Sequence, residues 1–194
     1  NYEDPAELMR EAGIRYRKWK KSQEELENPA SDDAEIPVGT SLEEAEESAW
    51  AEIQSYLKQM PPYEFQELVG SLLGAMGYHV SWIAPPGKDG GIDILAFTDP
   101  IGAQGPRIKT QVKRREQKAD VNDLRSFLAV LSSNDVGIFV STGGFTSDAA
   151  KEARHQENRQ ITLIDLERFF DLWVEHYDEL DEEDRQRLPL RKVY

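Results

Sequence analysis

The sequence contains no cysteine among its 194 residues. Disulfides, thiolate metal ligands and cysteine nucleophiles are therefore excluded, and a chain without cysteine fits the reducing cytoplasm, where we expect this protein. No apolar run approaches the ~20 residues that a membrane-spanning helix needs, and no signal-peptide pattern opens the chain, so we expect no membrane partner. The first residue is Asn1 rather than methionine, which leaves room for a further domain upstream.

The sequence also lacks the net positive charge that is typical of nucleic-acid-binding proteins. Its formal net charge is -14, but the acidic residues are distributed unevenly. The net charge is -8 over residues 1–59, -2 over 60–165 and -4 over 166–194. Because net charge governs solubility and steering rather than local contacts, a basic patch in the nearly neutral middle segment can still bind phosphate groups.

Both ends of the chain are expected to be helical and acidic. Residues 6–27 read as a charged helix, and the Pro- and Asp-rich segment 28–40 as a linker without periodicity. Ser41, with Glu44 three residues later, has the pattern of a capping box and predicts that a second helix starts there. An amphipathic helix at 166–177, followed by an acidic tail, is expected at the other end. The three expected parts are an amino-terminal extension at 1–60, a central domain at 61–165 and a carboxy-terminal extension at 166–194.

Helices and strands alternate in the central part. Pro61 and Pro62 begin a helix, since proline is tolerated in a first turn, and Gly77 is the expected stop. Apolar runs and period-two patterns predict the other elements. The expected strands are 78–83, 92–98, 107–114, 136–141 and 161–164, and further helices are expected at 121–131 and from about residue 147. This order predicts an α/β sandwich with a central mixed sheet and flanking helices.

Polar residues stand out on two of these strands. Asp93 follows two glycines and lies in an otherwise apolar strand, where a carboxylate is costly unless it is paired or bound to a metal; a solvent-facing position at the strand end is the alternative. In the next strand, period two places four polar side chains on one face: Arg107, Lys109, Gln111 and Lys113. An exposed sheet face would look the same, but Asp93, Gln111 and Lys113 can converge across two neighbouring strands.

Such a set suits the hydrolysis of a phosphodiester bond. A hard cation such as Mg²⁺ prefers oxygen ligands, here the Asp93 carboxylate, the Gln111 amide oxygen and a backbone carbonyl such as that of Val112. The cation stabilises charge on the phosphate and helps to form a nucleophilic water. A neighbouring lysine, Lys113, can orient that water and offset charge in the transition state.

Five ordered pieces of the sequence resemble the catalytic domain of Mrr-like restriction endonucleases, in the Q-x-K branch of the PD-(D/E)XK nuclease superfamily. The pieces are Pro62–Phe65 with Met76–Tyr78, Asp89–Asp93, Gln111–Lys113, Ser141–Thr146 and Ile164–Asp165. The resemblance covers about half of the chain. It implies a restriction-endonuclease-like fold and a DNA endonuclease that needs Mg²⁺ or Mn²⁺. It also makes Asp93 a metal ligand, puts Gln111 in the place of an acidic ligand, and makes Lys113 the catalytic lysine.

The chain departs from the family pattern in the first helix of the central domain. Gln66 stands where the family usually has a glutamate, and we include it among the candidate catalytic residues. On a helical wheel Gln66 lies at one edge of the apolar stripe, Glu64 lies at the opposite edge and Glu67 faces away. Neither glutamate is therefore expected to replace the missing carboxylate.

Candidate DNA contacts lie beside the catalytic set. They are Lys88, Arg114, Arg115, Lys118 and Thr142. A solvated strand end is an equally good account of the basic run, and most turns like that at Thr142 only connect elements.

The resemblance suggests restriction of foreign or modified double-stranded DNA, with sequence recognition in a separate upstream domain. A homodimer would supply the second active site for double-strand cleavage. The alternatives are a catalytically weak DNA-binding or assembly module on the same fold, and a structure-selective nuclease acting on branched DNA.

Overall fold

The computed structural model describes residues 38–87, 90–157, 159–188 and 190. The chain divides into two compact units, 1–48 and 49–194, and all the described strands belong to the second. The helix expected at 6–27 and most of the linker expected at 28–40 lie outside the described residues. Helix α2 (Val38–Gln59) already includes Val38 to Thr40, so a linker that continues to residue 40 and a capping box at Ser41 are both wrong. Residues 38–40 have low helix propensity, but they contain no proline, so they can extend a helix that continues for five more turns.

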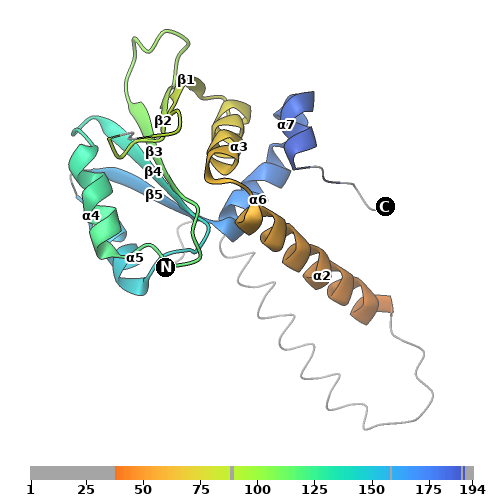
Figure 1. The fold of residues 1–194 in the computed structure, drawn as a ribbon. Helices are drawn as coiled ribbons and strands as arrows, with labels where there is room; N and C mark the ends of the chain where they lie inside the picture. The colour runs from red at the N-terminus through yellow and green to blue at the C-terminus, as the bar shows by residue number, and fades with distance from the viewer. Residues whose placement is uncertain (1–37, 88–89, 158, 189, 191–194) are drawn as a thin grey trace. The chain divides into compact units, whose positions relative to one another are not determined.

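A five-stranded sheet forms the centre of the second unit, with the strands in the order in which they occur along the chain (Figure 1). The strands are β1 (His79–Ile83), β2 (Ile94–Phe97), β3 (Arg107–Lys113), β4 (Asp135–Ser141) and β5 (Gln160–Asp165). The first three run antiparallel, and β3, β4 and β5 run parallel. The mixed sheet expected from the sequence is confirmed.

Helices cover both faces of the sheet. Helices α3 (Pro62–Ala75) and α6 (Leu166–Glu175) pack on one face, and α4 (Val121–Val130) and α5 (Ser147–Arg154) lie on the other (Figure 1). Two clusters of buried side chains follow this division, because alternate residues of each strand point to opposite faces. In β4, for example, Ile138 and Val140 join the cluster of α3 and α6, whereas Phe139 joins that of α4. Among the described residues, no helix is long and apolar enough to cross a bilayer.

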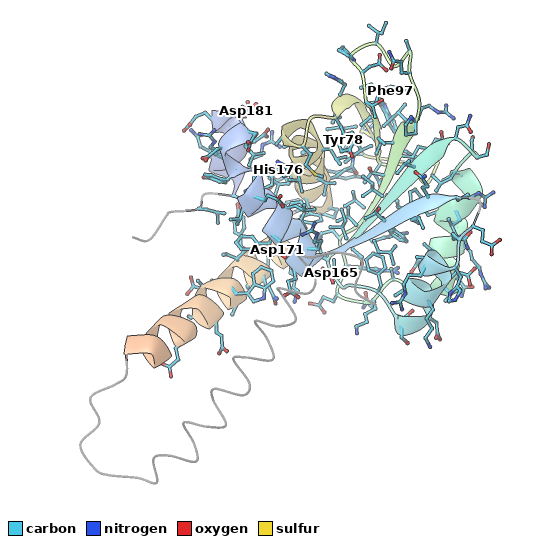
Figure 2. All side chains as sticks on the ribbon, turned by 180° about the vertical axis from the view of Figure 1, so that it is seen from behind. Tyr78, Phe97, Asp165, Asp171, His176 and Asp181 are labelled. Carbon is cyan, nitrogen blue, oxygen red and sulfur yellow. The ribbon has the colours of Figure 1, made fainter. Side chains whose placement is uncertain are left out.

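Helix α6 starts at an Asp165 cap, whose carboxylate accepts a hydrogen bond from the Arg168 N–H. Figure 2 shows it running from Asp165 past Asp171 to His176. It then continues into a short 3-10 helix, η1 (Tyr177–Glu179), and helix α7 (Glu182–Arg187). The segment after α6 is thus folded rather than only an acidic tail, since its leucines Leu180 and Leu188 are buried in the same core as Trp173. The division into parts at residues 60 and 165 stays a prediction.

Candidate active site

Asp93 lies immediately before β2, and its backbone continues the pairing with β3. Its N–H donates to the carbonyl of Thr110 at 2.8 Å, and its own carbonyl accepts from the Ala84 N–H at 2.7 Å. The carboxylate turns toward β3, where Oδ2 accepts a hydrogen bond from the Val112 N–H at 2.6 Å. Gly91, which has a φ of 86°, makes the turn into this position. The side chain is therefore buried and held by the backbone of the neighbouring strand.

Gln111 and Lys113 flank Val112, the residue of β3 whose N–H binds the Asp93 carboxylate. Asp93 precedes Ile94, which pairs with Thr110, so Asp93 lies beside the same end of β3 as Gln111 and Lys113. The Gln111 Oε1 atom is buried and has no hydrogen-bond partner among the described residues. Lys113 ends β3, and its side chain is one-third exposed. A carboxylate, an amide oxygen and an ammonium group therefore gather at one end of β3.

The other polar residues on this face of β3, Arg107 and Lys109, form an ion cluster with Asp135. Arg107 Nε and Lys109 Nζ each lie 2.8 Å from a carboxylate oxygen of the buried Asp135 on β4. Burial on its own would raise the pKa of Asp135, but the Lys109 ammonium, the Ser132 N–H and the Arg107 guanidinium together lower it to about 2. The single Asp135 carboxylate thus pairs with both cations at the start of the strand. The face that the sequence presents as one polar row is thus divided into a structural half and a candidate catalytic half.

Asp123 belongs to the site although the sequence reasoning did not single it out. It lies in the first turn of α4, where it forms a capping box with Asp120. Its Oδ1 is 3.9 Å from the Lys113 Nζ, and its Oδ2 forms an ion pair with Arg115. Hydrogen bonds from the Asp123 and Asn122 N–H groups and the nearby Arg115 charge lower the pKa of Asp120 against the opposing effect of burial. The D-x-x-D pattern before the apolar stripe of α4 was the available signal for this cap.

The proposed DNA contacts have varied surroundings. Arg114 donates to the backbone carbonyl of Lys58 in α2, and Arg115 is paired with Asp123. Thr142 is buried: its hydroxyl accepts from the Arg115 N–H at 3.0 Å and donates to the Arg115 carbonyl at 2.9 Å. Lys118 is exposed and Lys88 lies outside the described residues. Structural contacts thus account for Thr142, Arg114 and Arg115, while Lys118 is open to a partner.

Gln66 is buried in α3 and reaches the backbone beside the site. Its Nε2 donates to the carbonyl of Ala84 at 2.8 Å and lies 3.5 Å from that of Asp93. Glu64 and Glu67 are both exposed, and Glu67 pairs with Arg187 in α7. Gln66 is thus buried and both glutamates are exposed, in agreement with the helical wheel. That neither glutamate replaces the family carboxylate stays a prediction.

The oxygens at this end of β3 fit a hard divalent cation. No group of three or more histidine, aspartate or glutamate side chains that could hold a metal occurs in the described part of the chain. A cation would therefore need the Asp93 carboxylate together with neutral oxygens. The buried, unpartnered Gln111 Oε1 is such an oxygen, and Mg²⁺ commonly binds with one or two carboxylates and several waters.

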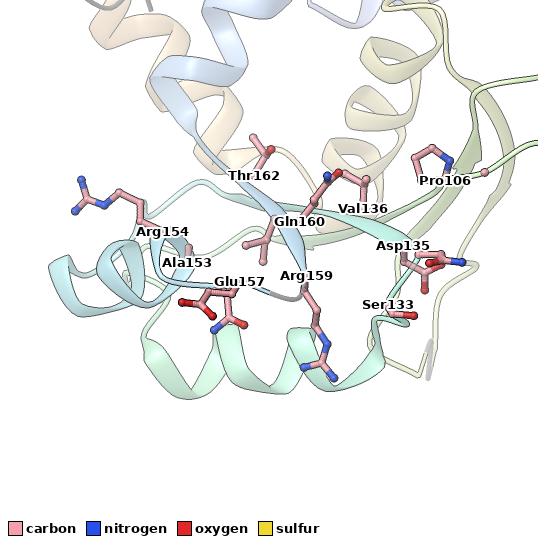
Figure 3. A pocket seen from close by; sticks show the side chains of 14 residues that line it. Pro106, Ser133, Asp135, Val136, Ala153, Arg154, Glu157, Arg159, Gln160 and Thr162 are labelled. Atoms are coloured by element: carbon pink, nitrogen blue, oxygen red, sulfur yellow. The ribbon is translucent and has the colours of Figure 1, made fainter. Parts of the chain in front are cut away.

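A pocket of about 1050 Å³ lies at the opposite end of the parallel strands, around the starts of β4 and β5 (Figure 3). Ser133, Asp135, Arg159 and Gln160 are among its lining residues. None of the candidate catalytic residues contributes to it. The pocket therefore does not mark the candidate active site, which is identified by its charged groups and by the unpartnered Gln111 oxygen.

Comparison with known proteins agrees with this arrangement. Residues 57–173 match the Mrr catalytic family, described as restriction endonuclease. The chain is 30% identical over 159 residues to the type IV methyl-directed restriction enzyme EcoKMrr of Escherichia coli (strain K12), covering 79% of this chain and 50% of that enzyme. It thus spans about half the length of the curated relative it matches.

The fold is also similar to that of the MspJI restriction endonuclease, solved in complex with a 27-mer oligonucleotide. The TM-score is 0.56 at 17% identity, covering 72% of this chain and 35% of that one. These findings confirm the family and the fold expected from the five sequence pieces. The chain belongs to the Mrr family of restriction endonuclease catalytic domains.

Proposed function

We propose that this chain is a DNA endonuclease domain that hydrolyses phosphodiester bonds with Mg²⁺ or Mn²⁺ and acts in DNA restriction. The observation that carries the proposal is the Asp93 carboxylate, which is anchored on the Val112 N–H of β3 between the positions of Gln111, whose amide oxygen is unpartnered, and Lys113. Family membership supports the same reaction class.

Each residue of the set has a distinct role in the proposal. Asp93 and Gln111 would hold the cation, together with a backbone carbonyl such as that of Val112. The bound cation would supply positive charge for the phosphate and make a water more acidic. Lys113 would orient that water and stabilise the additional negative charge of the transition state. Asp123 would hold the Lys113 ammonium near this position between turnovers, since the two groups are 3.9 Å apart.

The proposed substrate is double-stranded DNA, with methylated bases as the first modification to test. The relative from Escherichia coli is described as methyl-directed, and this chain corresponds to only half of that enzyme. Recognition of the methylated site would then lie in a different segment. Cleavage of both strands would need two catalytic domains, as in a homodimer.

Two other functions remain as alternatives. A DNA-binding or assembly module without catalysis is motivated by Gln66, which replaces the family glutamate. The other alternative is a nuclease on the same fold that is selective for branched DNA, which would be recognised by a preference for junctions over linear duplexes.

Cleavage of supercoiled plasmid tests the proposal directly. Methylated and unmethylated plasmids are incubated with the protein and Mg²⁺, Mn²⁺ or EDTA, and wild type is compared with Asp93→Ala and Lys113→Ala. Lys151→Ala is the matched control, because Lys151 is an exposed lysine of α5 outside the site. We expect metal-dependent nicking or linearisation by wild type and the control and none by the two site variants. Equal cleavage by Lys113→Ala and wild type would contradict the proposed role of Lys113 in hydrolysis.

A further inference from the structure

Gln66 connects three elements through its side-chain amide. The Nε2 atom donates to the Ala84 carbonyl, which follows β1, and lies 3.5 Å from the Asp93 carbonyl, which precedes β2. Ala84 and Asp93 are themselves joined by a hydrogen bond from the Ala84 N–H to the Asp93 carbonyl. The amide of α3 thus closes a network of hydrogen bonds around the backbone that carries the Asp93 carboxylate.

The direction of these bonds separates glutamine from glutamate. An amide nitrogen has two N–H donors, whereas an ionised carboxylate has none and can only accept. A glutamate in the same position would set a carboxylate oxygen against two carbonyl oxygens in a buried environment. That arrangement is unfavourable unless a proton or a cation lies between the oxygens.

We propose that Gln66 is a positioning residue that holds the Asp93 backbone without the help of a metal, so that the site takes a single divalent cation. The N–H groups of Gln66 satisfy the carbonyls that a glutamate side chain could satisfy only with a proton or a cation. The one cation is then held on the β3 side, by Asp93 and Gln111. This inference rests on the proposed metal-dependent function for the cation, whereas the hydrogen-bond network is independent of it.

Calorimetric titration with Mn²⁺, in the absence of DNA, tests the inference without measuring catalysis. The variants are Gln66→Glu and Gln66→Met, which keeps the length of the side chain but cannot hydrogen-bond to the carbonyls. Leu172→Ala, in the core on α6, is a destabilising control that leaves the site untouched. We expect wild type and Leu172→Ala to bind one Mn²⁺ with similar affinity. Gln66→Met should bind it about tenfold more weakly, as is usual when a group that supports a metal ligand is lost.

Thermal unfolding in EDTA supplies the second measurement. We expect Gln66→Glu to melt roughly 5 °C or more below wild type, with much of the loss recovered when Mn²⁺ is added. If Gln66→Glu does not fold, the Mn²⁺ affinity of Gln66→Met decides the question.

Several outcomes would overturn the inference. If Gln66→Met binds Mn²⁺ as tightly as wild type, only the positioning role of Gln66 is contradicted. A Gln66→Glu variant that is as stable as wild type in EDTA shows that donor groups are not needed at this position. Two Mn²⁺ ions bound by wild type contradict the single-cation site. No Mn²⁺ bound by wild type would contradict the proposed metal-dependent function together with the single-cation site.

Discussion

The ion cluster of Asp135, Lys109 and Arg107 gives a prediction whose size follows from the structure. Folding lowers the pKa of Asp135 from 3.8 to about 2. Since one pKa unit corresponds to about 1.4 kcal/mol, the ionised carboxylate contributes about 2 kcal/mol to the free energy of unfolding at neutral pH. Replacement by asparagine also leaves the largely buried Lys109 ammonium without its counter-ion, and breaking a buried pair typically costs about 3–5 kcal/mol. We therefore expect Asp135→Asn to lose between about 2 and 5 kcal/mol at pH 7.

The sign of the pH dependence follows from the direction of the shift. Because the pKa of Asp135 is lower in the folded state, its contribution is complete above the unfolded value near 4 and is lost as the pH falls through about 2. About half of it should be gone at pH 3. Stability of wild type and Asp135→Asn is measured by urea unfolding at pH 7, 5 and 3, with Asp148→Asn, an exposed aspartate of α5, as the control.

The difference between wild type and Asp135→Asn should be constant from pH 7 to 5 and then narrow by about 1 kcal/mol at pH 3. The control should stay within about 0.5 kcal/mol of wild type throughout. A difference below 1 kcal/mol at pH 7, or one that does not narrow toward pH 3, would refute the reasoning. Such a result would mean that the cost of burying the Asp135 carboxylate cancels its stabilisation by Lys109 and Arg107.

Two further substitutions test the Asp123 carboxylate beside Lys113 and the close approach of the backbone at Gly143. Asp123→Asn should lower plasmid cleavage, because Lys113 and Arg115 lose their shared carboxylate, and should cost about 1 kcal/mol of stability through the weakened helix cap; unchanged cleavage would remove Asp123 from the site. Gly143→Ala should destabilise the fold by about 1–3 kcal/mol, since a Cβ there would lie 2.5–2.8 Å from the carbonyl oxygens of residues 115–117. Gly74→Ala, which meets nothing within 4 Å, is its control in urea unfolding and should be neutral or stabilising; equal losses in the two variants would contradict the steric argument.

The strands could be predicted, and Asp93, Gln111 and Lys113 could be proposed as the candidate site, because both depend on local pattern. Period two placed Gln111 and Lys113 on one face of β3, and two glycines marked the turn into Asp93. A fixed alternation of side chains needs no knowledge of the rest of the chain.

The partners of the other polar residues could not be predicted in the same way. Asp135 meets Arg107 only because β4 lies parallel to β3 in the register that pairs these two residues. Asp123 reaches Lys113 because α4 folds back along the sheet. The hydrogen bonds of Gln66 depend on how α3 packs over the ends of β1 and β2. Strand registers and helix positions depend on packing between distant segments, and such packing produces no periodic pattern in the sequence.

The sequential order of the strands has a consequence for how the chain folds. Each strand pairs with the next one in the sequence, so each step of sheet formation closes a loop no longer than one helix and its turns, and low contact order favours fast folding. On a ribosome the sheet could therefore be assembled as soon as β5 has emerged. One of its faces would still lack the aromatic residues of α6, among them Phe169 and Trp173, so the few tens of residues after β5 complete the core last.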